Sequence, residues 1–215
     1  MNKTILITRP DDDSTLNLLF FWTEPVVILA KKKNFVVLDL KSEKSSKKVF
    51  DSYIRKNNPS LVFFNGHGSD NSIEGFNNEI LITGGLDEFL LKGRVVYSRT
   101  CSSASLLGPR CIKCGCKAFI GYDNPFWLPR SKTIYGNPLK DKMAERFLAP
   151  TNLIPTTLIK GHTASDAHNR SKREMSKNYR EMVSSISTSE ERKLSFFLYC
   201  NIVSQTLIGE PQSVL

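Results

Sequence analysis

Residues 61–70 read LVFFNGHGSD. The four apolar residues at 61–64 favour a buried strand, because aromatic and β-branched side chains pack well on a pleated surface. The strand stops at Asn-Gly-His-Gly, where two glycines free the backbone and bring its N–H groups into the open. A histidine held between glycines at a strand end is placed to act on a substrate. From this segment alone, a hairpin turn that merely contains a histidine is the alternative.

Similar apolar segments alternate with helix-length segments along the chain. Strands are predicted at residues 4–8, 34–40, 61–64, 94–98 and 117–122. Helices are predicted after Ser14 and at 44–57, 86–91, 102–116, 138–148 and 163–187, with an inserted hairpin at 73–83 and a last apolar element at 196–208. The predicted fold is α/β: a single domain over residues 1–215, arranged as a three-layer sandwich. It has a mostly parallel central sheet of about six strands with helices on both faces, and its sites lie at the C-terminal ends of strands.

Composition is ordinary for a soluble globular protein, with 40% hydrophobic and 24% charged residues among 215. No apolar run approaches the roughly 20 residues that span a bilayer, so no membrane partner is expected. The N-terminal segment MNKTILITRPDDD has a short apolar stretch followed at once by acids, which is unlike a signal peptide. We therefore expect a cytoplasmic protein whose five cysteines are thiols.

The formal net charge is +9, which raises the question of nucleic-acid binding. The basic runs at 31–33, 41–48 and 170–174 are spread along the chain and are best explained as solvated surface. No specific nucleic-acid partner is expected. A basic nucleic-acid-binding protein is nonetheless a rival interpretation, and its charge-driven binding would fade steeply with salt.

A second strand end carries a reactive group in VVYSRTCSSAS, residues 95–105. Cys101 follows His67 by 101 − 67 = 34 residues, and consecutive parallel strands would bring both side chains to one sheet edge. A thiolate attacks carbonyls, and an adjacent imidazole can activate it and protonate the leaving amine. The N–H groups of Gly68 and Cys101 could hold the oxyanion. For Cys101 alone a buried core thiol is the commoner explanation, but the two strand ends together favour catalysis.

These motifs resemble the caspase-like clan of cysteine peptidases, which includes caspases, gingipains, separase and the CHAT domains. Three further segments are most similar to the gingipain and CHAT members: GCKAFIGY (115–122), LIKGHTASDAHNRSKREM (158–175) and TLIGEPQSVL (206–215). The resemblance covers most of the chain. It implies a cysteine endopeptidase with His67 as base, Cys101 as nucleophile and Gly68 as oxyanion-hole donor.

The sequence departs from the family pattern at two places. Thr100 precedes the cysteine where the family usually has alanine, and Glu210 replaces the aspartate of the closing Gly-Asp-Pro. The caspase signature Gln-Ala-Cys-x-Gly is also absent, so it is not carried over. Neither departure removes a catalytic group.

The resemblance also implies that charged residues after the first strand line the specificity pocket. Here these residues are Arg9, Asp11, Asp12 and Asp13. The aspartates would select Arg or Lys before the scissile bond, whereas Arg9 would select acidic side chains. Three acids against one base favour basic specificity. The alternative is that the aspartates only cap the first helix.

Two other clusters have weaker functional interpretations. CIKCGC (111–116) offers three thiolates, but a structural zinc site normally has four ligands, so no metal is expected. In NPFWLP (124–129), Trp127 could wall a substrate cleft or plug the core.

The sequence thus predicts a peptidase that uses a Cys101–His67 dyad and a thioester intermediate, without a cofactor. Its substrates would be proteins or peptides, and a partner or signal would have to restrain it, so a regulatory protein partner is expected. The alternative is a catalytically inactive caspase-like interaction module.

Overall fold

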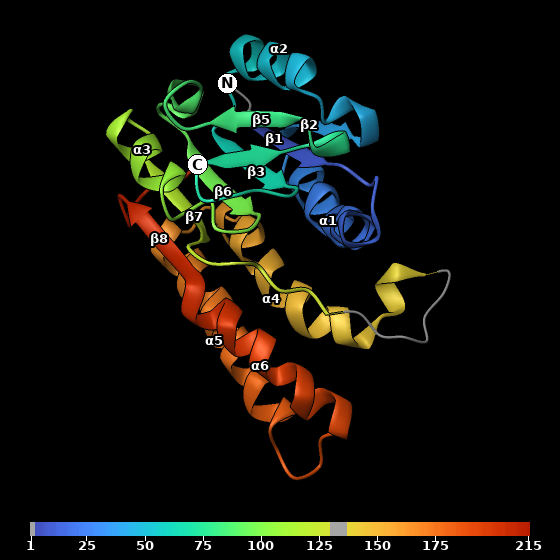
Figure 1. The fold of residues 1–215 in the computed structure, drawn as a ribbon. Coiled ribbons are helices and arrows are strands. Elements are labelled where there is room, and N and C mark those ends of the chain that lie inside the picture. The colour runs from blue at the N-terminus through green and yellow to red at the C-terminus, as the bar shows by residue number, and fades with distance from the viewer. Residues whose placement is uncertain (1–2, 130–136) are drawn as a thin grey trace.

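The computed structural model describes residues 3–129 and 137–215. Its centre is a six-stranded sheet in the order β2-β1-β3-β6-β7-β8 (Figure 1). The strands are β1 (Thr4–Arg9), β2 (Val36–Lys41), β3 (Leu61–Asn65), β6 (Val95–Arg99), β7 (Ala118–Tyr122) and β8 (Gln205–Gly209). All neighbours are parallel except β7 and β8. The predicted α/β fold with a mostly parallel sheet is confirmed.

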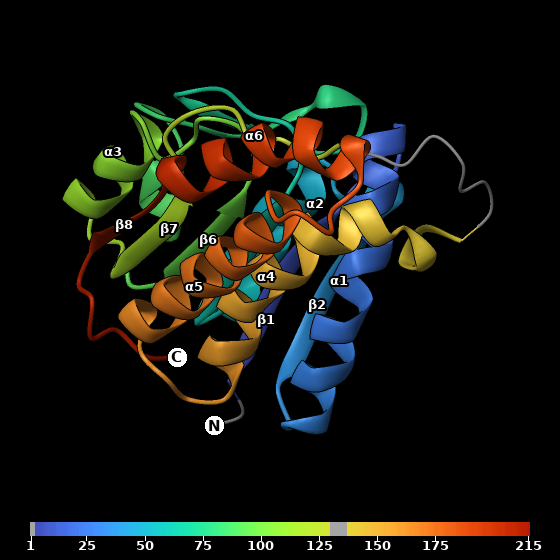
Figure 2. The same cartoon turned by 90° about the horizontal axis from the view of Figure 1, so that it is seen from below.

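Helices cover both faces of this sheet (Figure 2). One face carries α1 (Ser14–Lys32), α4 (Lys142–Ile159) and α5 (Ala164–Met182). The other carries α2 (Lys47–Asn57), α3 (Leu107–Lys113) and the antiparallel hairpin of β4 (Ser72–Glu74) and β5 (Ile80–Thr83). Helix α6 (Ser189–Ser204) packs on α5. The described residues also include short 3-10 turns at Ser42–Lys44, Phe76–Asn78, Glu88–Leu91 and Pro138–Lys140.

The central strand β3 explains why its sequence is continuously apolar. Leu61 and Phe63 pack towards α1 and α4, whereas Val62 and Phe64 pack towards α2 and α3. A parallel strand covered on both faces needs apolar side chains at every position. Among the helices of the described residues, none combines the length and apolar character needed to cross a bilayer.

Helix α4 is longer than the sequence predicted, because it continues through Pro150 and Pro155. A proline inside a helix removes the N–H that would bind the carbonyl four residues earlier. For Pro150 that carbonyl belongs to Arg146, and the side-chain amide of Asn178 on α5 donates to it at 2.8 Å. A neighbouring helix therefore supplies the missing donor.

Two other elements also differ from expectation. The helix predicted at 102–116 shortens to α3, since residues 102–106 form turns after β6. The apolar element at 196–208 divides into the end of α6 and the strand β8, which runs antiparallel beside β7 with Gly121 opposite Thr206.

Arg99, the last residue of β6, is a fully buried cation. Its guanidinium donates to Asn65 Oδ1 at 2.6 and 2.9 Å, to Thr23 at 2.7 Å, and to Thr151 and Asn152 at 3.1 and 3.0 Å. It also lies 5.2 Å from the ring centroid of Phe63. Burial lowers the pKa of Arg99, and among the described residues no carboxylate pairs with it. Neutral oxygens from α1, β3 and α4 thus hold this charge.

We predict that Arg99→Met lowers the free energy of unfolding by roughly 3 to 5 kcal/mol, because it leaves several buried acceptors without a donor. Urea unfolding measures the change. The control is Arg173→Met, which removes an exposed arginine on α5 and should cost no more than about 0.5 kcal/mol. Equal stability of the two variants would show that the guanidinium network does not hold the strand ends.

Candidate active site

His67 lies two residues beyond the end of β3, half-exposed at the C-terminal edge of the sheet. Its Nε2 is 2.5 Å from Oδ2 of Asp13. The other carboxylate oxygen of Asp13 accepts from the N–H groups of Thr15 and Leu16, at 2.6 and 2.8 Å, and so caps α1. Asp13 therefore binds the imidazole and the helix at once.

The charge state of Asp13 follows from these contacts. Partial burial would raise the pKa of its carboxyl group, but the Leu16 N–H and the His67 ring more than offset this, so the pKa lies below its usual value. Asp13 is an anion at neutral pH. Because an ionised carboxylate only accepts hydrogen bonds, Nε2 of His67 carries a proton, and in the neutral form of the ring Nδ1 is then left as an acceptor.

Cys101 lies two residues beyond the end of β6, and β6 is paired with β3. The register places Asn65 opposite Arg99, so residues 67 and 101 stand the same distance past a paired position. Gly68 also packs on this segment: a Cβ added to it would lie 3.1 Å from Cβ of Thr100. The two loops are therefore in direct contact.

The Cys101 thiol is half-buried, and its sulfur lies 3.8 Å from the carbonyl oxygen of Phe126. Burial raises the pKa of the thiol, and the Glu74 carboxylate raises it further. Among the described residues no hydrogen bond joins this sulfur to His67. The cysteine is thus a neutral thiol in this state, and a separate basic group must take its proton before it can attack a carbonyl.

The backbone around these two side chains offers donors. Within the described part of the chain, neither the Gly68 N–H nor the Cys101 N–H has an acceptor. Gly68 is paired with Ile73 in an isolated antiparallel bridge. The hydrogen bonds of this bridge are made by the residues on either side, from Ser69 to Ser72 and from Glu74 to His67. The N–H of Gly68 itself therefore points away from the hairpin. Ser102, next to the cysteine, has a φ of +53°, a left-handed conformation that non-glycine residues rarely adopt.

The charged residues predicted for the specificity pocket have structural partners. Asp11 accepts from the Ser42 hydroxyl at 2.8 Å, and Asp12 accepts from the Asn77 N–H at 2.9 Å. Arg9 is 0% exposed.

The guanidinium of Arg9 pairs with Glu24 and Asp39, both at 2.8 Å. It therefore has no exposed surface with which to contact a substrate. Sequence reasoning missed this because both acids lie on other elements, α1 and β2.

Trp127 is 43% exposed in the segment that follows β7. Its backbone N–H and carbonyl are bound by the side-chain amide of Asn201 on α6, at 2.8 and 2.7 Å, and its ring lies 4.9 Å from that of Phe197. Helix α6 thus fixes the segment whose Phe126 carbonyl faces Cys101.

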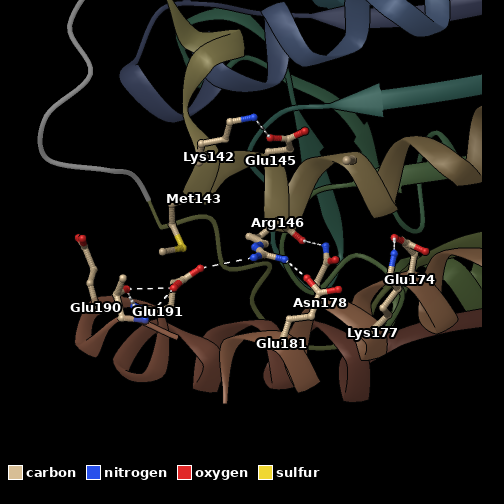
Figure 3. Close-up of a pocket in the computed structure, with 12 residues that line it drawn as sticks. Lys142, Met143, Glu145, Arg146, Glu174, Lys177, Asn178, Glu181, Glu190 and Glu191 are labelled. Atoms are coloured by element: carbon tan, nitrogen blue, oxygen red, sulfur yellow. Dashed lines mark hydrogen bonds and ion pairs between the residues drawn. The ribbon is translucent and has the colours of Figure 1, made fainter. Parts of the chain in front are cut away.

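Two other regions were candidates for binding. Among the described residues, no group of three or more His, Cys, Asp or Glu could hold a metal ion, and burial raises the pKa of Cys116 to about 12. A cavity of about 640 Å³ lies between α4, α5 and α6 (Figure 3). Its central Arg146 pairs with Glu181 and Glu191, and its other charges include the pairs Lys142–Glu145 and Lys177–Glu174. None of the predicted catalytic residues lines it.

Asp13 should contribute to the stability of the folded protein because it caps helix α1. Asp13→Ala removes the helix cap and should cost about 1 kcal/mol, whereas Asp13→Asn keeps a capping oxygen and should cost only a few tenths. Because the pKa of Asp13 is lowered in the folded state, its contribution is fully present above its ordinary value of 3.8 and is lost as the pH falls through the folded value.

Urea unfolding between pH 7 and pH 3 measures both effects. The difference in the free energy of unfolding between wild type and Asp13→Asn should become smaller below about pH 4. If this difference in free energy stayed constant down to pH 3, the contact between the Asp13 carboxylate and the His67 imidazole would be contradicted.

The fold is similar to that of known peptidase structures. The crystal structure of the Arg-specific cysteine proteinase gingipain R aligns with 99% of this chain, at a TM-score of 0.56 and 12% identity. The complex of the pro- and mature domains of RgpB from Porphyromonas gingivalis also aligns with 99%, at a TM-score of 0.57 and 11% identity. This chain spans about half of those chains, 47% and 48%. No protein-family model and no curated protein matches it. The predicted resemblance is thus confirmed for the fold, which is similar to that of gingipain R.

Proposed function

We propose that the protein is a cysteine endopeptidase in which Cys101 is the nucleophile, His67 the general base and Asp13 the residue that orients the imidazole. The observation that carries this proposal is the Asp13–His67 hydrogen bond of 2.5 Å beside the strand end that holds Cys101. A base must be fixed in one tautomer to accept a proton, and the Asp13 carboxylate leaves Nδ1 of the ring for that task.

The reaction has two halves. His67 takes the thiol proton as the Cys101 sulfur bonds to the carbonyl carbon of the peptide, and the carbonyl oxygen becomes an oxyanion. The C–N bond then breaks, the imidazolium gives its proton to the leaving amine, and a thioester remains. Water deprotonated by His67 attacks the thioester, which releases a carboxylic acid product and restores the thiol.

The oxyanion needs donors that are free before the substrate arrives. The Gly68 and Cys101 N–H groups have this property within the described chain. Donors that are already oriented stabilise the developing charge without reorganising, and removing one such donor typically costs about 10²- to 10³-fold in kcat.

Further parts of the proposal concern substrates, control and location. A preference for Arg or Lys before the scissile bond is supported by the acidic residues at the sheet edge and by the Arg specificity named for the gingipain R structure. A regulatory protein partner is supported by the pro-domain in the complex named above. We propose a cytoplasmic location from the sequence alone.

We predict that Cys101→Ala and His67→Ala each reduce cleavage of a peptide library to background, because each removes a group that forms or breaks a bond. Their thermal midpoints should shift by no more than about 3 °C, since both side chains are half-exposed. Cys200→Ala, at a half-buried cysteine on α6, is the matched control and should keep full activity.

An electrophilic peptide distinguishes the peptidase from an inactive interaction module. Mass spectrometry of the folded wild type should find it on Cys101 and should find far less in His67→Ala. A wild type that neither cleaves the library nor is labelled at Cys101 would refute the proposed function in favour of the module.

A further inference from the structure

The β4–β5 hairpin lies against the loop that carries His67. Gly68 bridges to Ile73, the Ser69 N–H donates to the Ser72 carbonyl at 3.0 Å, and the Glu74 N–H donates to the His67 carbonyl at 3.0 Å. A Cβ added to Gly66 would lie only 2.0 Å from the Glu74 carbonyl oxygen, so the two backbones are in close contact. This pairing puts Glu74 directly opposite His67.

Residues that face each other in an antiparallel pair project on the same side, with Cβ atoms about 5 Å apart. Ile73 is fully buried in the core, so its neighbours Ser72 and Glu74 project to the other side. The hydroxyls of Ser69 and Ser72 are 2.9 Å apart, which identifies this outer side. His67 and Glu74 lie two positions away from the Ser69–Ser72 pair, so their side chains project to this same outer side.

Glu74 also acts on the nucleophile, since its charge opposes ionisation of the Cys101 thiol. Its carboxylate is therefore within electrostatic reach of Cys101, and its backbone pairs with that of His67. Within the described residues no cation pairs with Glu74. Three other acids of this edge are engaged: Asp13 with His67, Asp12 with the Asn77 N–H and Asp11 with Ser42.

A half-buried carboxylate that lies opposite the candidate base, with no paired cation among the described residues, can receive a cationic group of a substrate. We propose that Glu74 is the specificity-determining residue of this peptidase and pairs with the ammonium or guanidinium group of a Lys or Arg that precedes the scissile bond. This inference rests on the proposed function and replaces Asp11, Asp12 and Asp13 as the source of basic specificity.

The arrangement also links recognition to activation. Without substrate, the Glu74 charge helps to keep Cys101 protonated. A bound cation offsets that charge, so a basic substrate lowers the free-energy cost of forming the thiolate that attacks it. A substrate without a cationic side chain does not change the free-energy cost of forming the thiolate.

The test compares wild type with Glu74→Gln, a change that keeps size and removes charge. For peptides with Lys or Arg before the scissile bond, kcat/KM should fall about 100-fold or more. For matched peptides with Gln or norleucine it should stay constant or rise, which also shows that the variant is folded. Glu79→Gln, at an exposed position of the same hairpin, should behave as wild type on both sets.

A second measurement does not need peptidase activity. In a Cys114→Ser, Cys200→Ser background, Cys101 is modified by methanethiosulfonates that carry either a trimethylammonium or a sulfonate group. Wild-type Glu74 should favour the cationic reagent, and Glu74→Gln should lower the cationic-to-anionic rate ratio at least about fivefold.

The outcomes separate the two proposals. Cleavage that prefers non-basic residues, or that survives Glu74→Gln and is lost in Asp12→Asn, overturns the role of Glu74 while the peptidase stands. An unchanged reagent ratio overturns that role as well. A changed ratio in a protein that cleaves nothing supports the position of the charge and refutes the peptidase.

Discussion

The buried guanidinium of Arg99 holds together the two strand ends on which the candidate site is built. Arg99 ends β6 and binds the side chain of Asn65, which ends β3. His67 and Cys101 each follow one of these residues by two positions, so their spacing depends on this contact. The same group reaches Thr23 of α1 and Thr151 of α4. Within the described residues the hydrogen-bond acceptors of this cation are neutral oxygens, so a smaller donor in its place would leave some of them buried and unpaired.

Much of the fold could be predicted from the sequence, because parallel strands buried on both faces are continuously apolar and helix-length segments separate them. Helix α4 shows where local rules fail. Two internal prolines argue for a break, but Asn178 lies on another helix and supplies the donor that Pro150 removes. Tertiary contacts of this kind leave no signal in the segment itself. The division of residues 196–208 into α6 and β8 also depends on pairing with β7, far away in the chain.

The candidate site divides in the same way. Strand ends in the sequence could place His67 and Cys101 beyond adjacent strands. The aspartates after β1 could be recognised as helix caps, and Asp13 is one, but its second oxygen binds His67. A prediction that β1 and β3 are neighbours in the sheet would have indicated this contact, because Asp13 follows β1 and His67 follows β3. Arg9 and Glu74 could not be judged from the sequence, because their surroundings come from α1, β2 and a hairpin register that only the folded chain defines.

Asp13 both caps α1 and binds the His67 imidazole, and together these two roles restrict which residues can replace it. Serine and threonine are good helix caps but carry no charge for an imidazole, and asparagine caps well yet is neutral. Glutamate keeps the charge but is not among the residues that cap well. Aspartate alone satisfies both demands, so this position should drift less than an ordinary capping residue, even in lineages where the rest of the first helix diverges.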